Sequence, residues 1–116
     1  MQEVEKSIAD VIAALLTEND AARDVLAERA RQVSAEGWTP AHDDAHFDGA
    51  IARAAASYAL SSAGYPHLGM DVWPWSRDWW KPADRRRDLV KAGALILAEI
   101  ERLDSASQST IAEASQ

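Results

Sequence analysis

The sequence predicts an all-α fold, a small bundle of about four helices with a tryptophan-rich loop before the last helix. Three observations predict it. Apolar residues recur at helical spacing in four segments. No segment alternates apolar and polar residues as a half-buried strand does. All 5 glycines and 4 prolines lie between residues 37 and 93, which leaves both ends of the sequence without helix breakers.

The first half of the chain reads as two helices. Residues 1–17 predict an amphipathic helix, because apolar side chains recur on one face: Val4, Ile8, Val11, Ile12, Leu15 and Leu16. Thr17 is expected to cap a second helix over about residues 18–36, and Gly37 to end it. The inward-facing residues expected in this second helix are Val25, Leu26, Ala30 and Val33.

The second half predicts two more helices around the loop. Thr39 and Pro40 suit a helix start, and the helix is expected to reach about residue 62 with Phe47, Ile51, Ala54, Ala55 and Tyr58 inward. Pro82 is expected to open the last helix, with an apolar stripe of Leu89, Val90, Ile96, Leu97, Ile100 and Leu103. Residues 105–116 are small and polar and predict a disordered tail, so residues 18–104 are expected to form a single domain.

Composition narrows the function classes. The 116 residues carry 12 basic and 19 acidic side chains, a net charge of −7, so we expect no binding to duplex DNA, which would repel the chain. There is no cysteine, which excludes a disulfide framework and thiolate metal sites. No apolar run approaches the ~20 residues that a membrane span needs, and we expect a cytoplasmic protein without a membrane partner.

A short motif joins two histidines and two aspartates. His42 and His46 have the i, i+4 spacing that holds zinc on a helix in some proteases, with Asp43 and Asp44 between them. Three interpretations stay open: helix capping by the aspartates, contact with a ligand, and a metal site. We take His42, Asp43 and Asp44 as candidate ligand-binding residues and predict no metal or other cofactor.

Aromatic and basic residues make the second candidate feature. Four of the five tryptophans are Trp73, Trp75, Trp79 and Trp80, and Lys81 follows them. Such rings stack on a planar base or close a small core, and the sequence leaves both open. Trp38 is expected to join the same aromatic cluster.

Arg85, Arg86 and Arg87 start the last helix, where cations oppose the helix dipole. Two interpretations of this basic run stay open: contact with a phosphate, or pairing with nearby carboxylates such as Asp84 and Asp88.

These residues carry two resemblances. Residues 25–104 resemble a family of small uncharacterised bacteriophage and prophage proteins, through Gly37-Trp38-Thr39-Pro40 with His42-Asp43-Asp44 and through residues 73–103. More distantly, Gly37-Trp38-Thr39 followed by aspartates is similar to the RyR domain, although the His-Pro segment of that domain is missing here. The second resemblance implies a sensor of nucleotide-derived ligands.

The leading hypothesis is therefore a phage-encoded, homo-oligomeric binding protein that sequesters a nucleotide-derived immune signal in the host cytoplasm. The alternative is a helical protein–protein interaction module that acts on a host or phage protein. A third is a metal-dependent nucleotide hydrolase using His42, His46 and the nearby aspartates, although an enzyme is less expected than a binding protein. The predicted ligand-binding residues are Trp38, His42, Asp43, Asp44, Trp73, Trp75, Trp79, Trp80, Lys81, Arg85 and Arg86.

Overall fold

The computed structural model describes residues 2–17, 19–37 and 48–115, with side chains over 7–15, 19–37 and 48–107. These residues form five α-helices and one 3₁₀ turn and contain no strand, which confirms the all-α class. The helices are α1 (Gln2–Thr17), α2 (Asp20–Ser34), α4 (Ala50–Ser62), α5 (Pro66–Val72) and α6 (Arg85–Ser115), and the turn is η1 (Arg77–Trp79). Among the described residues, no helix has both the length and the apolar character needed to cross a bilayer.

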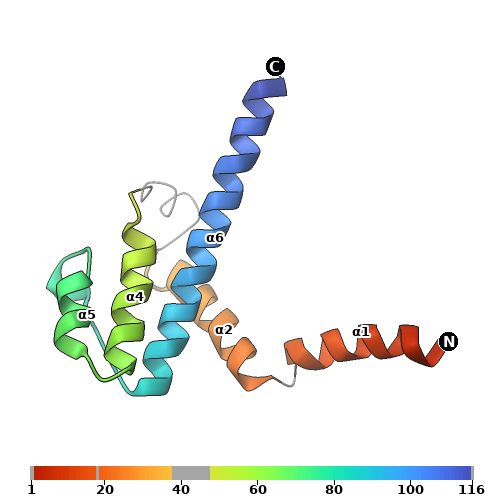
Figure 1. The fold of residues 1–116 in the computed structure, drawn as a ribbon, viewed down its shortest axis with the longest axis horizontal. Helices are drawn as coiled ribbons and strands as arrows, with labels where there is room; N and C mark the ends of the chain where they lie inside the picture. The colour runs from red at the N-terminus through yellow and green to blue at the C-terminus, as the bar shows by residue number, and fades with distance from the viewer. Residues whose placement is uncertain (1, 18, 38–47, 116) are drawn as a thin grey trace.

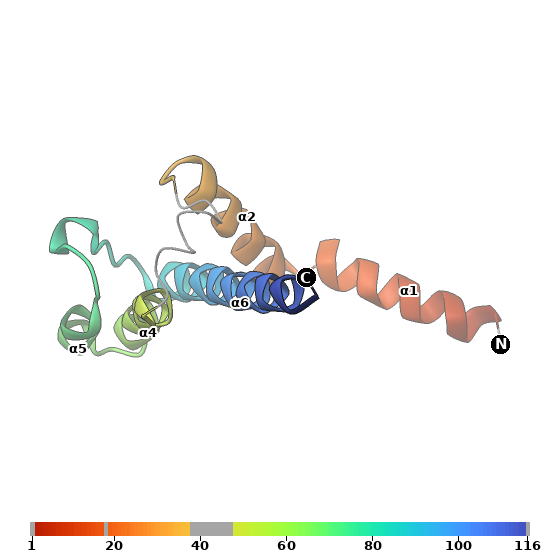
Figure 2. The same ribbon diagram turned by 90° about the horizontal axis from the view of Figure 1, so that it is seen from above.

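Helix α4 lies between α5 and α6, and α2 crosses α6 on another side (Figures 1 and 2). The predicted inward residues of α4 are confirmed, because Ile51, Ala54, Ala55 and Tyr58 are buried. Phe47 lies outside the described residues. Opposite them α6 presents two alanines and a leucine, at 92, 98 and 95, so the two helix backbones approach closely and small side chains fill the interface.

The apolar stripe predicted for the last helix is mostly not in the core. Val90 is buried, but Leu89, Ile96, Ile100 and Leu103 are each about half exposed. The alanine-rich face of α6 takes their place against α4, because a close helix–helix approach leaves room for alanine and not for a row of larger side chains. The larger apolar residues therefore face away from the core.

Helix α2 also differs from its prediction. Thr17 ends α1, and the cap is Asn19, whose side-chain oxygen accepts from the Ala22 N–H at 3.0 Å. The buried side chains of α2 are polar (Glu28, Arg29 and Gln32), whereas Leu26, predicted to face inward, is 49% exposed. This face of α2 packs against polar side chains of α6, among them Arg87, which contacts Glu28.

The start of α6 is set by two carboxylates rather than by Pro82. Asp84 accepts from the Arg87 N–H at 2.8 Å, and Asp88 accepts from the Ala83 N–H at 2.6 Å, which satisfies N–H groups at the helix start. The helix therefore begins at Arg85. Asp88 is also a buried partner of Ser61 in α4, at 3.2 Å, so the same carboxylate ties the helix start to the core.

Two other segments contain more helix than predicted. Helix α6 continues to Ser115, where the sequence predicts a disordered tail over 105–116. No glycine or proline follows Gly93, so nothing in this segment breaks the helix that precedes it. Within the tryptophan-rich segment, α5 forms from Pro66, a favourable first residue of a helix, and η1 turns the chain between Trp75 and Trp80.

Candidate functional site

Three of the four loop tryptophans belong to the core. Trp73 is buried, its Nε1–H donates to the Ser76 carbonyl at 2.9 Å, and its ring meets that of Tyr58 edge-on at 5.5 Å. Trp75 and Trp80 pack against Trp73, with ring centroids 5.2 Å away in both cases. Such contacts stabilise a core and leave these three rings little free face for a ligand. Trp79 differs from them, because it is 48% exposed.

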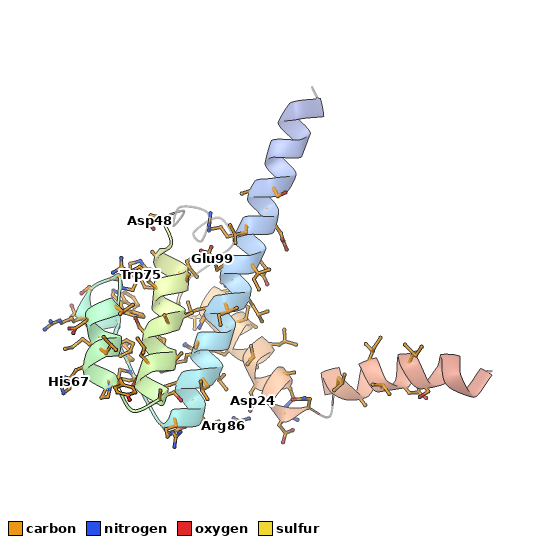
Figure 3. The ribbon with its side chains drawn as sticks, in the orientation of Figure 1. Asp24, Asp48, His67, Trp75, Arg86 and Glu99 are labelled. Atoms are coloured by element: carbon orange, nitrogen blue, oxygen red, sulfur yellow. The ribbon has the colours of Figure 1, made fainter. Side chains whose placement is uncertain are left out.

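The predicted arginines join helices together. Arg85 donates through Nε to the carbonyl of Ser62 at 3.1 Å, and so satisfies a carbonyl at the end of α4. Arg86 pairs with Asp24 at 2.9 Å where α2 meets the start of α6 (Figure 3). These contacts offset the unfavourable position of cations at a helix start. Neither Arg85 nor Arg86 lines the cavity described next.

A cavity of about 250 Å³ lies between α2, α4, α6 and the end of the tryptophan-rich segment. Two of the predicted site residues, Trp79 and Lys81, line it. The other lining residues escaped sequence reasoning, because polar residues on a helix are usually solvated. The full lining is Glu28, Arg31, Gln32, Glu36, Tyr58, Trp79, Lys81 and Lys91.

The acidic side of the cavity is a closed charge network around Glu28, which is buried. Arg31 donates to both oxygens of this carboxylate, at 2.7 and 2.8 Å, and Arg87 of α6 makes a third contact. Burial opposes ionisation of Glu28, but hydrogen bonds from Arg31 and the charges of Arg31 and Arg87 outweigh it and hold the pKa of Glu28 below its ordinary value. Arg31 also reaches Glu36 at 3.1 Å, and both carboxylates raise the pKa of its guanidinium.

Two ammonium groups also line the cavity. Lys91 Nζ donates to the carbonyl of Lys81 at 2.6 Å and lies 5.3 Å from the centre of the Tyr58 ring. Lys81 Nζ lies 5.7 Å from the centre of the Trp79 ring. Burial and the charge of Arg87 lower the pKa of Lys91. Among the described residues, these ammonium groups therefore contact a carbonyl and aromatic faces, and both lysines line the cavity.

Gln32 supplies a hydrogen-bond acceptor without a partner. Its side chain is 1% exposed, and its Nε2 donates to Glu28 at 3.2 Å. An ionised carboxylate only accepts, so this bond fixes which end of the amide faces Glu28. Oε1 of Gln32 is buried and has no hydrogen-bond partner among the described residues. Such an atom costs ~1–3 kcal/mol, which a hydrogen-bond donor would recover once the side chains around Oε1 move to admit it.

The remaining candidates are placed elsewhere or not described. Trp38, His42, Asp43 and Asp44, and with them His46, lie outside the described residues. His67, the third histidine of the chain, lies on α5, on the far side of α4 from α6 (Figure 3). Within the ranges that the structure does describe, no group of three or more histidine, aspartate or glutamate side chains is arranged to hold a metal ion.

Comparison with known proteins yields no relative. No family model, no curated protein and no solved structure matches the chain.

Proposed function

We propose that the chain is a binding protein for a small aromatic anion of the nucleotide class, held in the cavity between α2, α4 and α6. The observation that carries the proposal is the meeting of three different groups at one cavity. These are the half-exposed ring of Trp79, the ammonium groups of Lys81 and Lys91, and the unpartnered acceptor of Gln32. A nucleotide has a complementary group for each.

The aromatic ring supports stacking. Trp79 lines the cavity and keeps about half of its surface exposed, so a planar base can lie against it without disturbing the buried rings of Trp73 and Trp80. Base–aromatic stacking contributes ~1–3 kcal/mol.

The charges support a phosphate. Arg31 binds both Glu28 and Glu36, whereas the ammonium groups of Lys81 and Lys91 contact a carbonyl and aromatic rings among the described residues. A hydrogen bond from an ammonium group to a phosphate is charge-assisted and stronger than a neutral one. The acceptor of Gln32 suits an exocyclic amine or a ribose hydroxyl.

The volume supports a small ligand. At about 250 Å³ the cavity lies just below the ~300–1,000 Å³ typical of ligand pockets, so a mononucleotide suits it better than a dinucleotide. With the resemblance to phage proteins, we propose sequestration of a nucleotide-derived signal, without its conversion, as the biological role.

Calorimetric titration with adenosine 5′-monophosphate, guanosine 5′-monophosphate, adenosine and inorganic phosphate tests the proposal. At least one mononucleotide is expected to bind more tightly than adenosine or phosphate, because only the mononucleotide reaches both Trp79 and the lysines. Lys91→Met is expected to weaken it ~10-fold or more, since a hydrogen bond to a charged group contributes ~1.5–3 kcal/mol.

Arg86→Met is the matched control. It removes the same charge from an exposed ion pair outside the cavity, so mononucleotide affinity should stay within about twofold. Absence of heat with every probe overturns the proposal. Equal losses from the two variants would also overturn it, because they would indicate a general effect of net charge rather than binding at this cavity.

A further inference from the structure

Apart from the cavity, α6 carries an apolar surface that its own core does not use. Leu89, Ile96, Ile100 and Leu103, here named the α6 stripe, are 49–54% exposed. Their separations of seven, four and three residues follow the a and d positions of a heptad pattern. The remaining position, Gly93, lies against Val25 of α2 and is not part of the open surface. This is the pattern with which one helix packs lengthwise against another.

Helix α1 carries a second surface of the same kind. Ile8, Val11, Ile12 and Leu15, here named the α1 stripe, are 53–62% exposed. Ile8, Val11 and Leu15 are separated by three and four residues, the spacing also found in the α6 stripe. From its junction with α2, helix α1 extends away from α4, α5 and α6 (Figures 1 and 2).

The extended shape leaves both stripes in contact with water. The radius of gyration is 17.1 Å, whereas a compact chain of this length has about 13 Å. Monomeric soluble proteins rarely leave extended apolar surfaces uncovered. A binding partner with complementary apolar surfaces would remove both the α1 stripe and the α6 stripe from water.

We infer that two copies of the chain exchange their N-terminal helices, so that the α1 stripe of each packs along the α6 stripe of the other. A second copy brings one α1 and one α6, so the exchange covers both stripes of both copies with a single, repeated contact. Pairing of α6 with α6 would leave α1 uncovered, and pairing of α1 with α1 would leave α6 uncovered.

Charge gives the direction. In sequence, Glu3 and Glu5 stand at the start of α1, and Arg85 stands at the start of α6, beside Arg86 and Arg87, which pair with Asp24 and Glu28 of the same chain. Parallel alignment with Val11 and Leu15 beside residues 96 and 100 brings the acidic start of α1 near Arg85. Antiparallel alignment brings the acidic start of α1 toward Glu101 and Asp104 instead.

Sedimentation equilibrium of the full chain tests the exchange. The expected mass is twice 12.7 kDa. Val11→Glu and Ile96→Glu should each give the monomer mass with an unchanged helical circular dichroism spectrum, because both residues are outside the core. Leu68→Glu is the matched control, because Leu68 is 48% exposed on α5, outside both stripes, and it should leave the dimer intact.

Engineered cysteines identify the contact, since the chain has none of its own. Val11→Cys mixed with Ile96→Cys should form a disulfide-linked dimer on oxidation, and Leu68→Cys mixed with Ile96→Cys should not. A monomer mass for the unmodified chain at 100 µM overturns the inference. So does a dimer that Ile96→Glu disrupts and Val11→Glu does not, or efficient linkage of Ile96→Cys to itself, because either result indicates pairing of α6 with α6.

Discussion

Glu28→Gln is expected to destabilise the folded chain by about 2–3 kcal/mol. The substitution keeps the shape of the side chain and removes its charge, so Arg31 and Arg87 lose the carboxylate that they share. Breaking a buried ion pair by removing one partner costs ~3–5 kcal/mol. Glu28 is 1% exposed, but Arg31 and Arg87 are 41% and 38% exposed, so water relieves part of this cost and the lower figure follows.

The effect is large enough to measure by thermal unfolding. At ~2.1 cal/mol/K per residue, the unfolding entropy of 116 residues converts this loss into a fall in Tm of about 8–12 °C. Asp20→Asn is the control, because Asp20 pairs with Arg23 in water and should cost at most about 1 kcal/mol. A Glu28→Gln variant no less stable than Asp20→Asn would show that the charge network around Glu28 adds no more stability than an exposed ion pair.

The same carboxylate predicts a pH dependence. The pKa of Glu28 is lower in the folded chain than in the unfolded one. Its contribution to stability is therefore fully present above the unfolded-state pKa of about 4.3 and is lost as the pH falls through the lower, folded-state pKa. Urea unfolding at pH 7 and pH 3 should show a smaller loss of stability on acidification for Glu28→Gln than for the unmodified chain.

Two further predictions concern Gly69 and Lys91. Gly69→Ala should lower the free energy of unfolding, measured in urea, by ~1–3 kcal/mol. The added Cβ would stand 2.6 Å from the Ser57 carbonyl oxygen. In an unobstructed helix alanine is more stable than glycine, so a stabilised variant would contradict this close contact. Mononucleotide affinity should fall as the pH rises through the alkaline range, because burial and the charge of Arg87 lower the pKa of Lys91, which therefore loses its proton before an ordinary lysine does. The affinity of the Lys91→Met variant should fall less over the same pH range. If calorimetry shows the same pH dependence of affinity for both chains, this ammonium group has no role in binding.

Helix α4 shows what could be predicted from the sequence alone. The spacing of Ile51, Ala54, Ala55 and Tyr58 predicts one buried face, and the structure buries all four. Periodicity succeeds here because both faces of the interface are apolar and area removed from water is the main source of stability. Periodicity fails for α2, where Glu28 and Gln32 are buried and Leu26 is exposed.

The candidate site could be predicted only in part. The sequence predicts Trp79 and Lys81 as an aromatic and basic pair in the site. It does not distinguish Trp79, which lines the cavity, from Trp73, which is buried in the core. Lys91 gives no local signal, because its position beside Lys81 and Tyr58 depends on how α6 lies against α4.

Local spacing and propensity are enough to predict the all-α class, the buried face of α4 and the amphipathic N-terminal helix. Tertiary packing sets which polar residues are buried, which tryptophan stays exposed and which apolar stripes lack a partner in the single chain. A buried charge is stable only beside a partner, and that partner can be distant in sequence, as Arg87 is from Glu28. No periodicity within one helix contains that information.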